Sequence, residues 1–159
     1  MCKLTSFWHR PDNGDVAVLK LEHHDETYKG LNLNKLWREG HYLPDGKIEA
    51  RVQDEDRLTQ EECNERIRKR WPTFISFLKW CWTQPGVLNA DGSYGGGLDL
   101  SGLTSLAPGC LPKSIGGRLY LDSLTSLVPG CLPKNIGGGI YLNSLSSAER
   151  EEVRKKCGK

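Results

Sequence analysis

The sequence predicts an α+β protein: a small N-terminal sheet-plus-helix unit packed on a short C-terminal parallel β-solenoid that ends in a capping helix. Three observations predict this class. Alternating apolar residues flank a turn near residue 45, a long amphipathic pattern follows, and a 21-residue segment then repeats. We therefore expect an α+β unit over residues 1–94, a solenoid over 95–147 and a capping helix over 148–159.

The N-terminal unit is expected to contain a strand and a β-hairpin. Residues 15–22 read Asp-Val-Ala-Val-Leu-Lys-Leu-Glu, which is typical of a buried strand. Segments 36–43 and 47–52 flank a Pro-Asp-Gly sequence at 44–46, where proline presets φ and glycine tolerates a positive φ. The pattern therefore predicts a hairpin and, with the first strand, a three-stranded sheet covered by a helix.

The helix over this sheet is predicted from spacing. Thr59 and Glu62 stand three residues apart, as in a capping box. Apolar residues then recur at steps of three and four: Cys63, Ile67, Trp71, Phe74, Leu78 and Trp82. This is one amphipathic helix or two joined at Pro72, because proline either kinks a helix or begins one.

The internal repeat is the strongest signal in the chain. Segments Gly95–Ile115 and Gly116–Ile136 differ at only six of 21 positions, and a third copy begins at Gly137 and then breaks off. A fixed period of this length is typical of a solenoid, in which each turn stacks on the previous one and buries a continuous apolar column. The alternation in Leu119-Tyr120-Leu121 predicts a short strand whose leucines face inward, with equivalent residues ~4.8 Å apart.

The end of the repeat is expected to be closed by a helix. Ser146 and Glu149 have capping-box spacing. Acidic residues come first and lysines last in the following segment, which complements the helix dipole. Ala148 and Val153 supply a thin apolar side that could cover the open end of the leucine column.

The Leu-x-Leu strands and the Leu-Thr-Ser-Leu and Leu-Pro turns over residues 95–147 resemble bacterial leucine-rich repeats. The resemblance implies a solenoid. In the common pattern an asparagine follows each strand and forms a ladder, whereas here that place is taken by Leu103, Leu124 and Leu145. The turn after each strand must therefore differ from the turn of the common repeat.

Two N-terminal segments, 6–11 and 37–52, resemble a module found in uncharacterised bacterial and prophage proteins with short leucine-rich repeats. That resemblance implies a mobile-element origin and carries no activity with it.

Composition and charge exclude several classes. The chain is 37% hydrophobic and 26% charged, which suits one soluble core, and its net charge of +2 gives no strong field toward nucleic acid or anionic lipid. The longest mostly apolar run, residues 74–82, is shorter than the ~20 residues of a membrane span. No apolar signal segment opens the sequence, so we expect a cytoplasmic protein.

The cysteines indicate packing more than chemistry. None of the six stands in a Cys-x-x-Cys pair, and without a secretory signal we expect reduced thiols. Cys110 and Cys131 occupy the same repeat position and should lie beside each other. A cysteine nucleophile would need a base, and no histidine follows His41.

Metal and acid–base sites are weakly indicated. The run from His23 to Glu26 contains four potential ligands, but adjacent strand residues point to opposite faces, so at most alternate ones converge. His9, His24 and His41 have no second group at a fixed spacing. We predict no catalytic residue, no metal and no cofactor, and keep open a small enzyme or metal-binding protein that uses these N-terminal histidines.

Nucleic acid is disfavoured as a partner. The basic cluster on the predicted helix follows acidic residues that can pair with it at i,i+4; it comprises Arg66, Arg68, Lys69 and Arg70. Residues 1–94 carry a net charge of −1 and residues 95–159 a net charge of +3. Neither half has the basic footprint of a nucleic-acid-binding protein.

The favoured function is non-enzymatic protein binding. Exposed residues at equivalent places on successive turns can contact one partner over an extended face; they are Arg118, Tyr120, Asp122, Tyr141 and Asn143. Phe77 and Trp80 fall toward the edges of the helix stripe, where they either pack internally or form an exposed aromatic patch for a partner.

The prophage resemblance extends this expectation to a host defence complex as the partner, as for an anti-CRISPR or another counter-defence inhibitor. The alternative is a leucine-rich-repeat effector acting on a host protein, although such effectors carry a separate catalytic domain. The sequence leaves the oligomeric state open.

Overall fold

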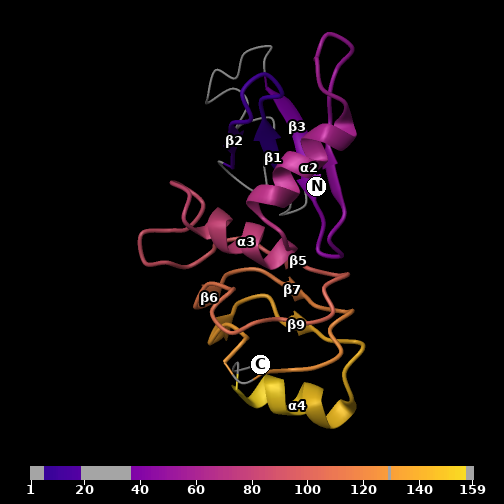
Figure 1. Cartoon of the computed structure of the whole chain (residues 1–159). Coiled ribbons are helices and arrows are strands. Elements are labelled where there is room, and N and C mark those ends of the chain that lie inside the picture. Colours follow the sequence, from indigo (N-terminus) through magenta and orange to yellow (C-terminus); the bar gives the residue numbers. More distant parts are fainter. Residues whose placement is uncertain (1–5, 19–36, 129, 157–159) are drawn as a thin grey trace. The chain divides into compact units, whose positions relative to one another are not determined.

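The computed structural model describes residues 6–18, 37–128 and 130–156, and the chain forms a mixed α/β protein with several small sheets (Figure 1). It divides into two compact units, residues 1–87 and 88–159. The sequence places the division after residue 94. The structure places it earlier because Tyr94 already pairs with the repeat: its N–H donates to the Ser114 carbonyl at 3.0 Å, and its carbonyl accepts from the Gly116 N–H at 2.8 Å.

The first unit contains a four-stranded antiparallel sheet in the order β2-β1-β3-β4. Its strands are β1 (Ser6–His9), β2 (Val16–Ala17), β3 (Arg38–Tyr42) and β4 (Ile48–Ala50). The prediction of three strands was wrong because β1 lies at the centre of the sheet. The sequence of β1, Ser-Phe-Trp-His, is too short to show the apolar alternation from which a strand is predicted. The predicted strand 15–22 is reduced to β2, and residues 19–22 lie outside the described residues.

The predicted hairpin is confirmed. The Leu43 N–H donates to the Lys47 carbonyl at 2.8 Å, and the Gly46 N–H donates to the Leu43 carbonyl at 2.9 Å. Gly46 has a φ of 95°, a conformation that a side chain disfavours. Ile48 and Ala50 are buried on one face of β4, as the alternation predicts.

Two helices follow, α2 (Gln60–Arg70) and α3 (Phe74–Trp82), so the break at Pro72 separates two elements. The Thr59–Glu62 capping box of α2 is confirmed. A second capping box, formed by Thr73 and Ser76, starts α3. Because both helices begin at their own cap, each can turn a different set of apolar residues toward the core.

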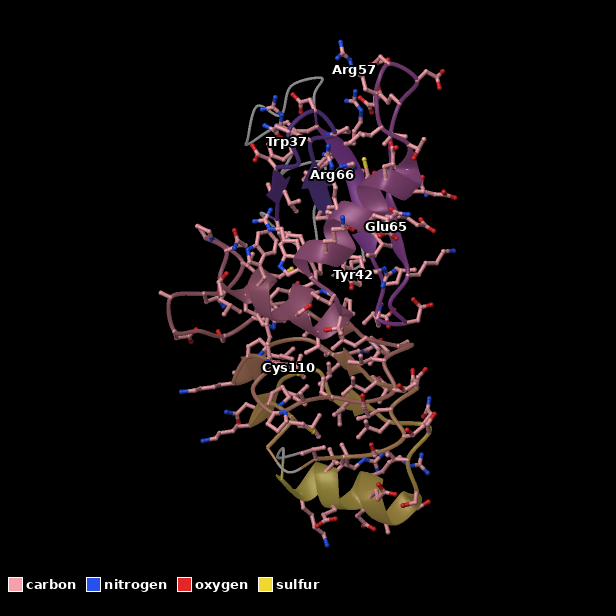
Figure 2. All side chains as sticks on the ribbon, viewed as in Figure 1. Trp37, Tyr42, Arg57, Glu65, Arg66 and Cys110 are labelled. Atoms are coloured by element: carbon pink, nitrogen blue, oxygen red, sulfur yellow. The ribbon has the colours of Figure 1, made fainter. Side chains whose placement is uncertain are left out.

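The core of the first unit is aromatic. The Phe77 ring meets Phe7 edge-on with centroids 5.7 Å apart and stacks on Tyr42 at 5.2 Å. The buried Tyr42 hydroxyl donates to the Trp71 carbonyl at 2.9 Å, which joins β3 to the end of α2 (Tyr42 is labelled in Figure 2). A side chain at Gly40 would place Cβ 2.3 Å from the Phe7 ring, so glycine there makes room for this cluster.

The second unit contains the repeat. Strands β5 (Leu98–Asp99), β7 (Leu119–Tyr120) and β9 (Ile140–Tyr141) form a parallel sheet, and β6 (Ser114–Ile115) pairs with β8 (Asn135–Ile136). The register pairs Leu98 with Leu119 and Leu119 with Ile140, one period apart. The leucines of these strands and turns are buried: Leu98, Leu100, Leu103, Leu119, Leu121, Leu124, Leu142 and Leu145.

Glycines at one corner of the repeat permit close approach of successive turns. A methyl group at Gly116 would lie 2.6 Å from the Gly95 carbonyl oxygen, and one at Gly137 would lie 2.3 Å from that of Gly116. The opposite corner is a repeated hydrogen-bonded turn in which Leu103, Leu124 and Leu145 each donate to the leucine three residues earlier, at 3.1 Å.

The chain ends in α4 (Ser147–Lys156). The Glu149 N–H donates to the Ser146 hydroxyl at 3.2 Å, so Ser146 caps the helix as predicted. Val153 is buried, whereas Ala148 is exposed, which corrects the prediction that both cover the leucine column. Across the described residues, no helix combines the length and apolar character that crossing a membrane requires.

Candidate binding face of the parallel sheet

The outward positions of β5, β7 and β9 form the candidate site, which we call the outward face. Along each strand the leucines point inward and are buried, so the intervening side chains point out. Parallel pairing then places nine residues in three columns: Gly97, Arg118 and Gly139; Asp99, Tyr120 and Tyr141; Ser101, Asp122 and Asn143. All five predicted repeat-face residues therefore lie on this face.

Two tyrosines stack at the centre of the outward face. The rings of Tyr120 and Tyr141 are nearly parallel, with an interplanar angle of 10° and centroids 4.8 Å apart. In-register parallel strands hold equivalent side chains at this spacing, so the sheet itself orders the rings. Tyr141 is 38% exposed and is one of the few large apolar side chains that face solvent among the described residues.

Arg118 lies next to the tyrosine stack. Its hydrogen bond with Tyr120 raises the pKa of the guanidinium. A methyl group at Gly138 would lie 2.8 Å from Arg118 Cγ, so the arginine stem runs over this glycine of the following turn. The equivalent residues in the previous and the next turn are Gly97 and Gly139, so Arg118 is the one side chain in its column.

The acidic residues of the outward face are partly used within the fold. The Asp99 carboxylate accepts a hydrogen bond from the Ser101 N–H at 3.1 Å. The Asp122 carbonyl accepts from the Ser144 hydroxyl, and its carboxylate oxygen Oδ1 is buried with no hydrogen-bond partner. Asn143 is exposed at the end of the same column. Tyr120, Tyr141, Arg118 and Asn143 are therefore the side chains with most freedom to contact a partner.

Phe77 does not belong to a surface patch. It is 1% exposed and packs among Phe7, Tyr42 and Trp71, so the prediction of a partner contact at this residue was wrong. Trp80 is half-buried and packs on Trp71 with centroids 4.5 Å apart. The helix has aromatic residues on more than one face because α3 packs inside an aromatic cluster.

The cations on α2 serve the first unit. Arg66 donates to the Pro11 carbonyl and Arg68 to the Gly46 carbonyl, each at 3.0 Å (Arg66 is labelled in Figure 2). Arg70 lies over the Trp71 ring at 4.6 Å. These contacts tie loops to the helix in place of the predicted pairs with acidic residues.

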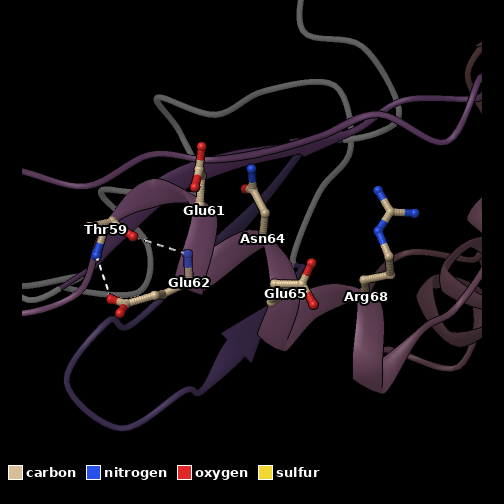
Figure 3. Close-up of a pocket in the computed structure, with 6 residues that line it drawn as sticks. All are labelled: Thr59, Glu61, Glu62, Asn64, Glu65 and Arg68. Carbon is tan, nitrogen blue, oxygen red and sulfur yellow. Dashed lines mark hydrogen bonds between the residues drawn. The ribbon is translucent and has the colours of Figure 1, made fainter.

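A shallow depression of about 530 Å³ lies along α2 (Figure 3). Its lining residues all come from this helix and its cap: Thr59, Glu61, Glu62, Asn64, Glu65 and Arg68. Thr59 and Glu62 are occupied in the capping box, and Asn64 accepts a hydrogen bond from the Ala50 N–H at 2.7 Å.

The histidines that the structure describes have structural contacts. His9 is buried, its Nε2–H donates to the Arg51 carbonyl at 2.8 Å, and burial lowers its pKa. His41 Nε2 lies 3.1 Å from Glu39 Oε1, and His41 Nδ1 lies 3.3 Å from the Ser6 hydroxyl oxygen. His23 and His24, with the candidate metal run 23–26, lie outside the described residues. Within the described segments, no group of three or more potential ligands could hold a metal ion.

The described cysteines are buried in both units. Cys110 (labelled in Figure 2) and Cys131 are 0% and 3% exposed at equivalent repeat positions. In the first unit, burial raises the pKa of Cys63 and strongly raises that of Cys81. A thiol with a raised pKa is a poor nucleophile, so Cys63 and Cys81 act as small apolar core residues.

A sequence signal for the outward face lies in the differences between the two complete repeats. Of the six positions that differ, three are the outward strand positions, where Gly97, Asp99 and Ser101 are replaced by Arg118, Tyr120 and Asp122. The buried leucines between them are unchanged. Side chains that vary while their scaffold stays constant are typical of a surface that does something other than hold the fold together.

Comparison with protein-family models, with curated proteins and with solved structures finds no match to this chain.

Proposed function

We propose that this chain is a non-enzymatic protein-binding module whose second unit, a short leucine-rich-repeat-like solenoid, presents the outward face to one protein partner. The observation that carries the proposal is the stacked pair of tyrosines on the parallel sheet, half-buried Tyr120 and exposed Tyr141. Tyrosine and arginine are enriched at the energetic centres of protein interfaces, because a large ring loses little conformational freedom on binding.

The structure of the first unit supports the same proposal. The described histidines are engaged in packing and ion pairs, and the described thiols are buried. Reduced, buried cysteines are consistent with the cytoplasm. A host defence complex is our proposed partner class on the basis of the resemblance to prophage proteins with short leucine-rich repeats.

The proposal is tested with the tagged full-length protein expressed in a bacterial host. The double variant Tyr120→Ala/Tyr141→Ala should lose a partner that the parent protein retains in a stoichiometric complex on gel filtration. Once that partner is purified, its Kd should weaken by about thirtyfold, the factor for an interface hot spot of about 2 kcal/mol.

The matched control is Val128→Ser, since Val128 is 44% exposed in the same unit but lies outside the outward face. It should bind as the parent does, and circular dichroism should show both variants folded. Unchanged affinity of the folded double variant would refute the outward face as the contact.

A further inference from the structure

Three arginines of the first unit lie within ion-pair distance of carboxylates. In the first unit, Arg10 pairs with Asp12 at 2.5 Å, and Arg38 pairs with Asp56 at 2.9 Å. Arg51 lies 3.7 Å from Glu39. In the described part of the chain, Arg118 has no carboxylate within ion-pair distance, although it stands beside the tyrosine stack of the outward face. An exposed arginine that the fold leaves without a carboxylate is available to a partner's carboxylate.

Arg118 is positioned before any partner arrives. Its stem crosses Gly138, where a methyl group would come within 2.8 Å, and its flanking strand positions are glycines. Its guanidinium interacts with the Tyr120 hydroxyl. The Tyr141 ring is stacked on Tyr120, so its hydroxyl lies on the same side of the sheet. Thus one cation and two phenol groups, which can all donate hydrogen bonds, come together on an open surface.

Two exposed lysines immediately precede strands β6 and β8. Lys113 and Lys134 occupy equivalent positions in successive turns, where the Lys134 N–H donates to the Lys113 carbonyl at 2.9 Å. Both are exposed, and neither forms an ion pair in the described structure. Only the short Ser-Ile-Gly-Gly segment separates Lys113 from Arg118. Like charges one turn apart repel each other, and a negatively charged partner would relieve this repulsion.

The aspartates of the outward face keep their negative charge, but in the described structure neither lies within ion-pair distance of Arg118, Lys113 or Lys134. Asp99 is bound to the Ser101 N–H, and the buried Oδ1 of Asp122 turns away from solvent. The backbone N–H groups of Leu98 and Leu119 on either side of Arg118 are already bonded between turns, so the face offers a ligand mainly side chains, which suits an extended peptide better than a free phosphate.

We propose that the partner contributes an acidic peptide segment, with one carboxylate held by the Arg118 guanidinium and the hydroxyls of Tyr120 and Tyr141, and others beside Lys113 and Lys134. A carboxylate matches the planar guanidinium by two parallel hydrogen bonds. This inference rests on the proposed function and specifies the chemistry of its partner.

The test measures binding of a fluorescein-labelled hexaglutamate peptide to the full-length protein by fluorescence anisotropy at low salt. Arg118→Gln should weaken binding by about fivefold, the factor expected for one exposed charge pair. Tyr120→Phe/Tyr141→Phe keeps the ring stack, removes only the hydroxyls, and should weaken binding by a smaller factor. The matched control is Arg154→Gln, which removes one charge from α4, away from the outward face.

Each outcome decides the matter. Equal losses in Arg118→Gln and Arg154→Gln would show nonspecific attraction and overturn the inference, as would absence of binding to the parent protein. Displacement of hexaglutamate by an equal concentration of inorganic phosphate would overturn the peptide carboxylate as ligand. If Tyr120→Ala/Tyr141→Ala abolishes capture of the natural partner while Arg118→Gln does not affect it, the protein-binding function stands and the acidic segment is refuted.

Discussion

The buried cores of the two units are built in different ways. The first unit surrounds three rings, Phe7, Tyr42 and Phe77, with strands and helices from distant parts of the chain. The second repeats one 21-residue turn and pairs each turn with the next in register. In the first unit each core residue has unique surroundings. In the second, each strand leucine pairs with the equivalent aliphatic residue of the neighbouring turn.

This difference determines where each unit is vulnerable and what its surface can do. A repeated turn leaves its outward positions free to change, since the inward leucines and corner glycines already specify the stacking. The first unit instead uses its polar side chains to close the fold, as when Arg38 binds Asp56 or His9 binds the Arg51 carbonyl. The candidate site therefore lies on the repeat.

The largest effect is expected where two turns touch. Gly137→Ala places a methyl group 2.3 Å from the Gly116 carbonyl oxygen, and we expect it to lower the free energy of unfolding by about 3 kcal/mol. Gly130→Ala is the control: Gly130 has a φ of +79° with nothing within 4 Å of the added methyl group, so only backbone strain of about 1 kcal/mol applies. Native-state hydrogen exchange of the Leu119 and Leu121 amides, which donate across turns, measures both. Equal effects would contradict steric contact as the cause.

A smaller effect is expected at the hydrogen bond that joins strand and helix in the first unit. Tyr42→Phe removes the 2.9 Å bond to the Trp71 carbonyl and leaves that carbonyl buried without this donor, at a cost of about 1 kcal/mol. Urea denaturation followed by tryptophan fluorescence reports on this unit, because all five tryptophans precede residue 88. A variant as stable as the parent would show that ring packing alone holds β3 to α2.

The smallest effect is a pH dependence of the first unit. Burial lowers the pKa of His9 below its ordinary 6.5, so the unfolded chain takes up the proton first as the pH falls. Stability is then complete above pH 6.5 and declines from there down to the pKa of folded His9. Asp56, whose pKa is lowered by its hydrogen bonds with Arg38, contributes a separate loss below its ordinary 3.8.

Chemical denaturation of the parent and of His9→Gln, at several values between pH 7 and 5, measures the histidine contribution. The parent should lose stability over this range, and the variant should lose less. An identical slope in both proteins would assign the pH dependence to another group.

The hairpin, both halves of the long helix and the cap of α4 could be predicted because each is encoded within a few residues, by Gly46, Thr59 with Glu62, and Ser146 with Glu149. The aromatic residues of α3 could not be assigned in this way. Periodicity placed Phe77 at the edge of a stripe, but the ring inserts between Phe7 and Tyr42, which lie 70 and 35 residues away in the sequence. Strand β1, which carries Phe7, was missed for the same reason.

The sequence by itself determined the period and register of the second unit and the identity of its outward residues, because a repeat compares the chain with itself at a constant separation of 21 residues. Only the tertiary structure decided that β1 completes the sheet and that Phe77 is buried. It also decided that Arg118 is hydrogen-bonded with Tyr120, whose ring stacks on that of Tyr141. These arrangements depend on side-chain packing between unlike elements, and the periodicity of a single element contains no information about what it packs against.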